Sequence, residues 1–198
     1  MKTTTFVTAI AACLATASAS SIPARCADNF GLPEGYTVTE LSWELETTPG
    51  GPKVALNGTV EQVHAQLLEI NPNYDVEFAA VEAGAEDVTA VDSRELQKRD
   101  WTERIIDGIA YLRSLGSRSA TNGPGPNNCA RVSCSWSSAI WYCNNNSFSK
   151  TMGFNHIANA AQVLVNECSY KNTNAVPRTW GERWHDDQWF AIVNQQDC

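Results

Sequence analysis

The chain has 198 residues, of which 43% are hydrophobic, and a formal net charge of −8 at pH 7. The acidic excess lies before position 100, because residues 20–99 hold 14 of the 22 acidic residues and 5 of the 14 basic ones. Residues 100–198 carry equal numbers of both signs, so they lack the positive excess that phosphate backbones attract. The charge therefore argues against a nucleic-acid partner.

The first 19 residues have the layout of a secretory signal peptide. Lys2 precedes an apolar stretch over residues 6–15, and the small residues 17–19 form the A-x-A pattern that suits signal peptidase. The apolar stretch is too short to hold the chain in a bilayer. We therefore expect a secreted, extracellular protein without a membrane anchor.

Residues 20–99 are predicted to form an acidic pro-segment. Alternating apolar side chains indicate a strand over residues 36–47, and the capping pair Thr59 and Gln62 begins a helix. A second strand is expected over residues 76–81. We expect this strand-helix-strand unit to act as an intramolecular chaperone or inhibitor. The alternative is a solubilising acidic spacer, since its last part has the composition of a disordered chain.

A dibasic pair, Lys98 and Arg99, stands where the acidic part gives way to the neutral part. A kexin-type protease of the secretory pathway cleaves after such pairs, and Asp100 with Glu103 would then cap a new helix. The sequence thus predicts three parts, which are a signal peptide 1–19, a pro-segment 20–99 and a mature disulfide-stabilised domain 100–198.

The predicted mature domain alternates between helix and strand patterns. Its helices are indicated by apolar residues at helical spacing, and its strands by β-branched and aromatic runs. A segment rich in glycine and proline indicates a loop. In chain order, these are a helix at 101–115, a loop at 117–128, a strand at 132–143, a helix at 155–167, and a strand pair at 179–184 and 189–194. We therefore expect an α+β fold, with a small disulfide-stapled antiparallel sheet and two helices.

Seven cysteines are present, and Cys13 would leave with the signal peptide. In an oxidising compartment the other six should form disulfides. The sequence contains no C-x-x-C pair, which argues against a zinc site. Five lie after Arg99, so either one thiol stays free, two products pair, or Cys26 completes the set and ties the pro-segment to the product. We expect no metal and no cofactor. The six are Cys26, Cys129, Cys134, Cys143, Cys168 and Cys198.

Cysteine pairing is not fixed by spacing alone. If residues 132–143 form one strand, the odd separation of Cys134 and Cys143 places them on opposite faces. They are therefore not expected to be partners. Cys168 lies on the apolar stripe of its predicted helix and can staple that helix to the sheet.

Six of the seven tryptophans follow Arg99. Trp136 and Trp189 alternate with apolar residues, which indicates core positions. The segment around positions 180–185 is more polar, which favours exposed rings that bind a protein or a glycan. We therefore predict a binding surface made of Trp180, Arg183, Trp184 and His185.

An enzymatic function finds little support in the sequence. His185 with Glu182, Arg183 and Asp186 could imitate the Glu, Arg and His set of small secreted fungal ribonucleases, in which imidazole and carboxylate exchange protons and guanidinium steadies phosphate. His64 and His156 are most simply surface or capping residues, and no hydrolase motif is present. No catalytic residue is therefore assigned, and a small ribonuclease or other hydrolase is the alternative.

Two sequons place acceptor asparagines in predicted turns. They begin at Asn57 and Asn145, and they indicate surface positions where a glycan could be attached.

Several stretches resemble small secreted effector-like proteins of filamentous fungi. They are CARVSCSWSSAI at 129–140, VNEC at 165–168, the final Cys198, LNGTVEQV at 56–63, and the dibasic junction. More remotely, residues 130–198 resemble the α/β-sandwich killer toxin carried by a virus of smut fungi. They lack that toxin's cysteine-rich opening, so its channel-blocking activity and functional residues are not carried over.

The resemblance implies a secreted effector- or toxin-like protein that binds an extracellular or host target after its pro-segment is removed. The expected partner is a host or competitor protein, or a cell-wall glycan. A glycan-binding module that shields or engages the cell wall is a further alternative to the ribonuclease.

Overall fold

The computed structural model describes residues 23–26, 32, 34–82, 101–170 and 178–198. The predicted signal peptide 1–19, the acidic run 82–95 apart from its first residue, and the processing site at Lys98 and Arg99 lie outside these ranges. The described residues form an α+β fold with four helices, two main sheets and three disulfides, which confirms the expected fold class. No described helix is both long and apolar enough to cross a bilayer.

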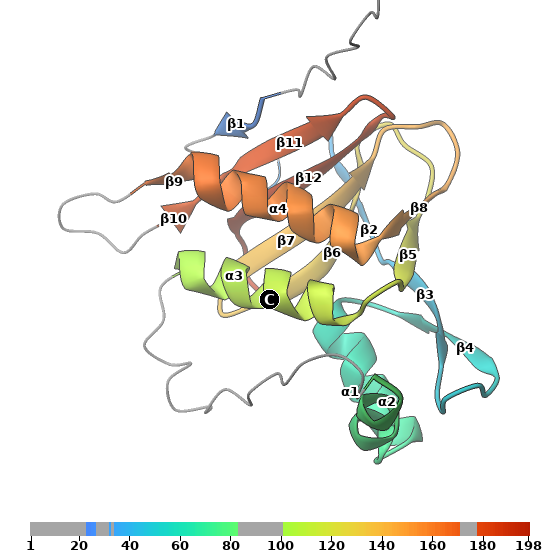
Figure 1. Ribbon diagram of the computed structural model, residues 1–198. Helices are drawn as coiled ribbons and strands as arrows, with labels where there is room; N and C mark the ends of the chain where they lie inside the picture. Colours follow the sequence, from blue (N-terminus) through green and yellow to red (C-terminus); the bar gives the residue numbers. More distant parts are fainter. Residues whose placement is uncertain (1–22, 27–31, 33, 83–100, 171–177) are drawn as a thin grey trace, which may run out of the picture.

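The larger sheet has six strands and forms the centre of the molecule (Figure 1). All neighbouring strands in it are antiparallel except β2 and β6, which are parallel. Strand β7 is buried along its whole length, as expected for a strand covered on both faces. Across the sheet the order is β1 (Arg25–Cys26), β11 (Gly181–His185), β12 (Trp189–Gln195), β7 (Ser138–Asn144), β6 (Asn128–Ser135) and β2 (Thr37–Thr39).

Two helices lie side by side on one face of this sheet, namely α3 (Trp101–Ser114) and α4 (Phe154–Cys168) (Figure 1). Both carry buried apolar residues at spacings of three and four, as in Ile105, Ile109 and Leu112 of α3. The helices predicted from periodicity are therefore confirmed to within a residue or two at each end.

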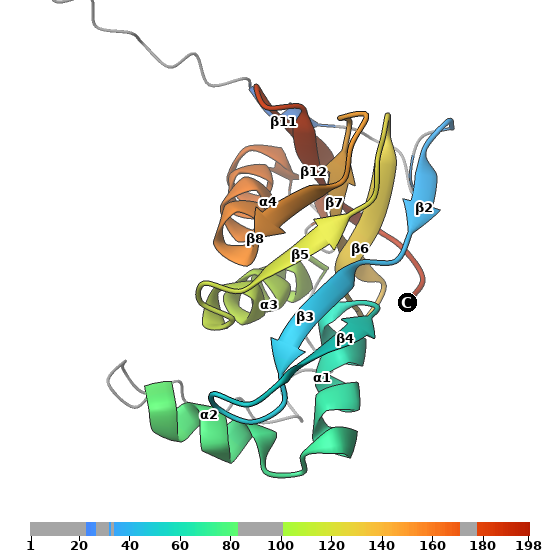
Figure 2. The ribbon, with the colours of Figure 1, turned by 90° about the vertical axis from the view of Figure 1, so that its right-hand side faces the viewer.

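A second, four-stranded sheet extends away from the first (Figure 2). It combines strands from before and after the expected processing site, because β3 pairs with both β4 and β5. Its order is β4 (Lys53–Asn57), β3 (Ser42–Glu46), β5 (Ser119–Asn122) and β8 (Lys150–Gly153). The remaining elements are α1 (Val60–Ile70), α2 (Tyr74–Glu82) and a two-stranded ribbon of β9 (Ser169–Tyr170) and β10 (Arg178–Thr179).

The predicted strand at residues 76–81 is wrong, because this segment belongs to helix α2. Tyr74 and Phe78, one turn apart, bring their ring centroids to 4.5 Å, while Val76 is 72% exposed. This is a helical pattern, and the contacts with His64 of α1 and with Arg118 show which side of the segment faces the protein. The preceding helix was predicted well, since Thr59 and Gln62 form the expected capping box.

Three further boundaries differ from the sequence prediction. Residues 36–47 form two strands in different sheets, β2 and β3, and residues 117–128 contain the strand β5. Residues 132–143 form a hairpin of β6 and β7, not one strand. Its turn at Trp136 and Ser137 has positive φ angles of 49° and 60°, a conformation that Asn-Gly usually supplies, so the residues at these positions carry no turn signal.

The two predicted parts of the chain share one hydrophobic core. Leu45 and Val63 from the predicted pro-segment lie in the same buried cluster as Ile109 and Leu164 from the predicted product. A smaller cluster lies on the opposite face of the six-stranded sheet, around Trp141, where Leu32 and Tyr36 pack against it.

The three disulfides are Cys26–Cys168, Cys129–Cys143 and Cys134–Cys198. The cysteine before the expected processing site therefore completes the set of six, which was one of three open possibilities. Cys134 and Cys143 are not partners, as expected, although they lie on two strands and not on one. Three disulfides fit a chain that folds in an oxidising compartment.

Candidate functional site

The four residues predicted to form a binding surface do not lie on one surface. Trp180 is 2% exposed, so the expectation that it is exposed is wrong. Trp184 is half-buried, and its ring stacks on Phe190 at a centroid distance of 4.0 Å. Arg183 and His185 alternate with Trp184 along β11 and therefore point to the opposite face of the sheet.

The residues proposed as a ribonuclease-like set are also separated. His185 lies on the side of the sheet that carries α4 and stacks on Trp189, with centroids 3.9 Å apart. Glu182 lies on the other side, where it accepts a hydrogen bond from the Tyr36 hydroxyl at 3.4 Å. A carboxylate and an imidazole on opposite faces of a strand cannot exchange a proton with one substrate.

His185 has a lowered pKa, chiefly because it is partly buried and secondly because the Arg183 guanidinium is near. The carboxylates of Asp187 and Asp186 act in the opposite direction, and His156 adds to the lowering. Its Nε2 is buried and has no hydrogen-bond partner among the described residues. The ring therefore behaves mainly as an aromatic packing partner of Trp189.

Of the two tryptophans predicted to lie in the core, one is confirmed there and one is not. Trp189, expected in the core, is buried there, but Trp136 is 58% exposed. The difference arises because Trp136 occupies the tip of the β6–β7 hairpin and not the middle of a strand. A large ring at a solvent-exposed tip does not contribute to the core, and exposed apolar surface of this kind is a candidate for an interaction site.

Beneath the exposed ring of Trp136 lies the side chain of Arg104, from the first turns of α3. The Cζ atom of Arg104 is 4.9 Å from the centroid of the Trp136 ring, which is a cation–π contact. Arg104 is only 4% exposed, and its Nε atom has no hydrogen-bond partner among the described residues. No carboxylate in the described part of the chain forms an ion pair with it.

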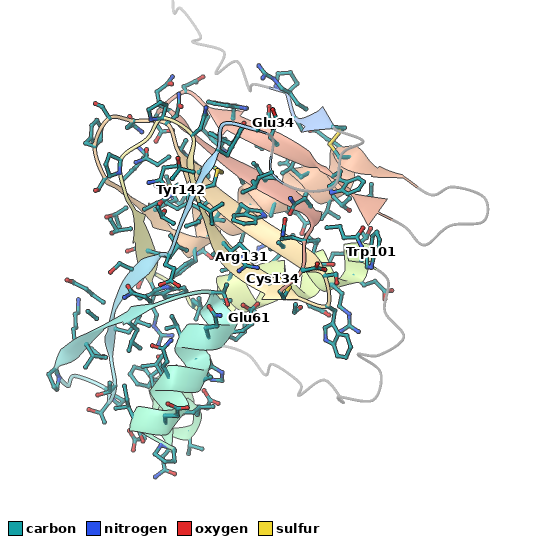
Figure 3. The ribbon with its side chains drawn as sticks, turned by 180° about the vertical axis from the view of Figure 1, so that it is seen from behind. Glu34, Glu61, Trp101, Arg131, Cys134 and Tyr142 are labelled. Carbon is teal, nitrogen blue, oxygen red and sulfur yellow. A yellow bond between two sulfur atoms is a disulfide. The ribbon has the colours of Figure 1, made fainter. Side chains whose placement is uncertain are left out.

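The hairpin tip is held in place from two directions. The Cys134–Cys198 disulfide and a hydrogen bond from the Gln196 amide to the Ser137 carbonyl, 3.2 Å long, attach it to the C-terminal tail. From the other side the Glu61 carboxylate accepts a hydrogen bond from the Cys134 amide at 3.2 Å (Figure 3). The tip is therefore a fixed projection, which lowers the entropic cost of any contact that it makes.

A second candidate site is a cleft of about 630 Å³ between β3, α1, α2 and the end of α3. Its walls are mainly apolar, and four aromatic or imidazole rings face one another in it. Its lining includes Trp43, Leu67, His64, Tyr74, Phe78, Tyr111 and Arg118.

Polar groups sit at two places on the cleft wall. His64 Nε2 and Asp75 Oδ1 are 2.8 Å apart, a close pair between α1 and α2. The pKa of Tyr111 is raised well above its usual value, first by burial and then by the nearby Asp75 carboxylate. Arg118 lies across the rings of Tyr74 and Phe78, at 6.0 and 5.2 Å from their centroids.

Neither of these two sites is predicted by the sequence. Nothing in the sequence distinguishes Arg104 from other helical arginines, because its burial depends on the hairpin that folds over it. His64 and Asp75 are separated by a helix break, and only the angle between α1 and α2 brings them together. The one available signal is the helical spacing of Tyr74 and Phe78, whereas the strand predicted over residues 76–81 includes only the second of them.

The remaining predicted positions are placed as follows. Asn57 is exposed at the end of β4. Asn145 is half-buried, and its side-chain amide donates a hydrogen bond to Gln188 Oε1 at 3.2 Å. In the described part of the chain, no three His, Cys, Asp or Glu side chains gather as a metal site requires.

Comparison with known proteins gave no match, whether to family models, to curated proteins or to solved structures.

Proposed function

We propose that this protein is a secreted, effector- or toxin-like binding protein that recognises a protein on the surface of a host or competitor cell. The tip of the β6–β7 hairpin makes the central contact. The observation that carries this proposal is the pairing of an exposed Trp136 with a buried Arg104 that has no ion-pair partner among the described residues.

A buried guanidinium without a counter-charge is costly, because water no longer solvates it fully. Among the described residues no carboxylate forms an ion pair with Arg104 that would compensate for this loss. The left-handed backbone at Trp136 and Ser137 adds a second cost, since residues with side chains avoid it. Two features that each cost stability meet at this one projecting tip, which supports a role of the tip in recognition. Tryptophan and arginine are also the side chains that most often dominate protein interfaces.

The chemistry of Arg104 defines the complementary group on the target. A carboxylate that reaches the guanidinium would form a charge-assisted hydrogen bond in a place from which the Trp136 ring excludes water. The target therefore presents an Asp or Glu side chain, or a chain terminus, next to an apolar surface that covers the indole.

A protein fits this tip better than a polysaccharide does. Sites for extended glycans use several aligned aromatic rings, whereas the exposed aromatics among the described residues, Trp136 and Phe148, lie beyond opposite ends of β7. We therefore rank the glycan-binding module second.

The working unit that we propose includes the segment before the expected kexin site. Cys26 is bonded to Cys168, and β3 pairs with β5. Cleavage after Arg99, which stays a prediction, would leave both parts attached to each other. Maturation by a kexin-type protease is thus a proposed step that frees chain ends without discarding the first part.

The test compares binding of fluorescently labelled protein to intact fungal and plant cells, to chitin and to β-glucan. We expect saturable binding to one cell type that Trp136→Ala weakens by about thirtyfold or more. Phe148→Ala is the matched control, since it removes an equally exposed ring elsewhere, and it should bind normally. Protease treatment of the cells should abolish binding. Binding that survives protease but is lost after glucanase or chitinase treatment would instead support the glycan alternative.

A further inference from the structure

We infer that the cleft between β3, α1, α2 and α3 is a binding site for a small amphipathic carboxylate, which has an apolar chain and a single anionic head group. This site is separate from the hairpin tip, and its occupancy does not depend on the function proposed above.

The size and lining of the cleft suit a small molecule. Its volume of about 630 Å³ lies within the range of roughly 300–1,000 Å³ that is typical of small-molecule sites. The floor consists of buried apolar side chains, including Leu45, Val63 and Leu67. An apolar chain placed there would leave water without losing any hydrogen bond.

The head-group preference follows from Arg118. This side chain lines the cleft and also a neighbouring polar hollow of about 650 Å³, so it stands at the boundary between the two. No carboxylate among the described residues forms an ion pair with its guanidinium, which rests on the rings of Tyr74 and Phe78. These rings orient the guanidinium but cannot neutralise it, so an anion at the cleft mouth is favoured.

The other charged groups of the cleft do not reverse this preference. The Asp75 carboxylate already has the His64 ring as its partner at 2.8 Å. A cationic head group would have to lie near Arg118 and would be repelled. A neutral head group would lack the charge-assisted hydrogen bonds that a carboxylate can form with a guanidinium.

The cleft exists only when both predicted parts of the chain are together. Trp43, His64 and Tyr74 come from residues 20–99, whereas Tyr111 and Arg118 come from residues 100–198. Ligand binding therefore also reports whether the first part stays in the working molecule.

The experiment uses the full chain after signal-peptide removal and three probes of equal chain length, which are dodecanoate, dodecanol and dodecyltrimethylammonium below their micelle concentrations. Isothermal titration calorimetry and tyrosine fluorescence measure binding. We expect dodecanoate to bind one molecule per chain, dodecanol to bind at least about tenfold more weakly, and the cation not to bind.

Variants identify the responsible group. Arg118→Gln should remove the preference for dodecanoate over dodecanol, while Arg118→Lys should keep most of it because the charge remains. Arg113→Gln is the matched control, as this exposed arginine lies five residues earlier, in the last turn of α3, and lines neither hollow. Thermal unfolding of each variant checks that it is folded.

Equal affinity for the three probes, or an unchanged preference in a folded Arg118→Gln variant, would overturn the inference. So would a concentration-dependent dimer that Phe78→Ala dissociates, because the cleft would then be a contact between two copies of the chain.

Discussion

The ring of Trp43 stacks on the ring of Phe154, with centroids 4.7 Å apart and planes inclined by 27°. Trp43 lies on β3 in the predicted pro-segment, and Phe154 is the first residue of α4 in the predicted product. Both side chains are fully buried, and the Trp43 Nε1 donates a hydrogen bond to the Gly58 carbonyl at 2.9 Å. This contact makes the first part of the chain a structural member of the core.

Replacing Trp43 should therefore destabilise the whole protein. We expect Trp43→Ala to lower the free energy of unfolding by about 3–5 kcal/mol, since it leaves a large cavity against Phe154. Urea unfolding followed by far-UV circular dichroism measures the change. Val76→Ala, at an exposed position of the same part, should change the stability by less than about 0.5 kcal/mol. Equal effects of the two changes would mean that residues 34–82 do not contribute to the core.

The Cys26–Cys168 disulfide predicts how processed protein behaves. If the chain is cut after Arg99, the two pieces should migrate together in a denaturing gel without reductant and separate when reductant is added. Mass spectrometry of both samples, with N-terminal sequencing, provides the measurement. With Cys26→Ser, the pieces should separate even without reductant. A single secreted fragment of residues 100–198 would show that the first part is discarded after folding.

Substitutions at the hairpin tip should raise the free energy of unfolding and weaken binding to the target. Replacing Trp136 and Ser137 together by Asn and Gly supplies the residues that this turn prefers. We expect the free energy of unfolding to rise by about 1 kcal/mol, because the relief of backbone strain exceeds the lost contact with Arg104. Thermal unfolding measures the gain, and Phe148→Asn is the control without such strain. A loss of stability on Asn-Gly replacement would show that the Trp136 ring has a structural role.

His185 should make stability depend on pH. Its pKa is lowered from 6.5 in the folded protein, so the unfolded chain binds a proton that the folded chain does not. The free energy of unfolding should therefore fall as pH decreases below about 6.5 and level off below the folded-state pKa. His185→Phe, which can keep the stack on Trp189, should show a shallower decrease in urea unfolding between about pH 5 and pH 7.5. Parallel curves would exclude this contribution.

Local signals in the sequence predict three of the four described helices well, the exception being α2. Each of these signals lies within a few turns of one helix. They are the capping box at Thr59, the apolar spacing of Ile105, Ile109 and Leu112, and the apolar stripe of α4. Contacts between residues three or four positions apart depend little on the rest of the chain, so they can be recognised directly.

The strands were harder to predict, because a strand is stabilised by partners that are distant in sequence. Residues 36–47 look like one strand but pair in two sheets, and β5 is formed by a segment whose flanking glycines and prolines indicated a loop. The β6–β7 hairpin was missed because Trp136 and Ser137 occupy turn positions that usually carry Asn and Gly. Pairing energy from the neighbouring strands overrides these local preferences.

The sequence by itself determined the α+β class, the main helices and the use of cysteines as disulfides, since each depends on composition or short-range periodicity. Only the tertiary structure decided that Cys26 pairs with Cys168 and that Trp43 belongs to the common core. It also decided that Trp136 covers a buried Arg104 and that Arg118 borders an aromatic cleft. These are contacts between distant segments, and they form because burying apolar surface brings together whatever residues the chain topology permits.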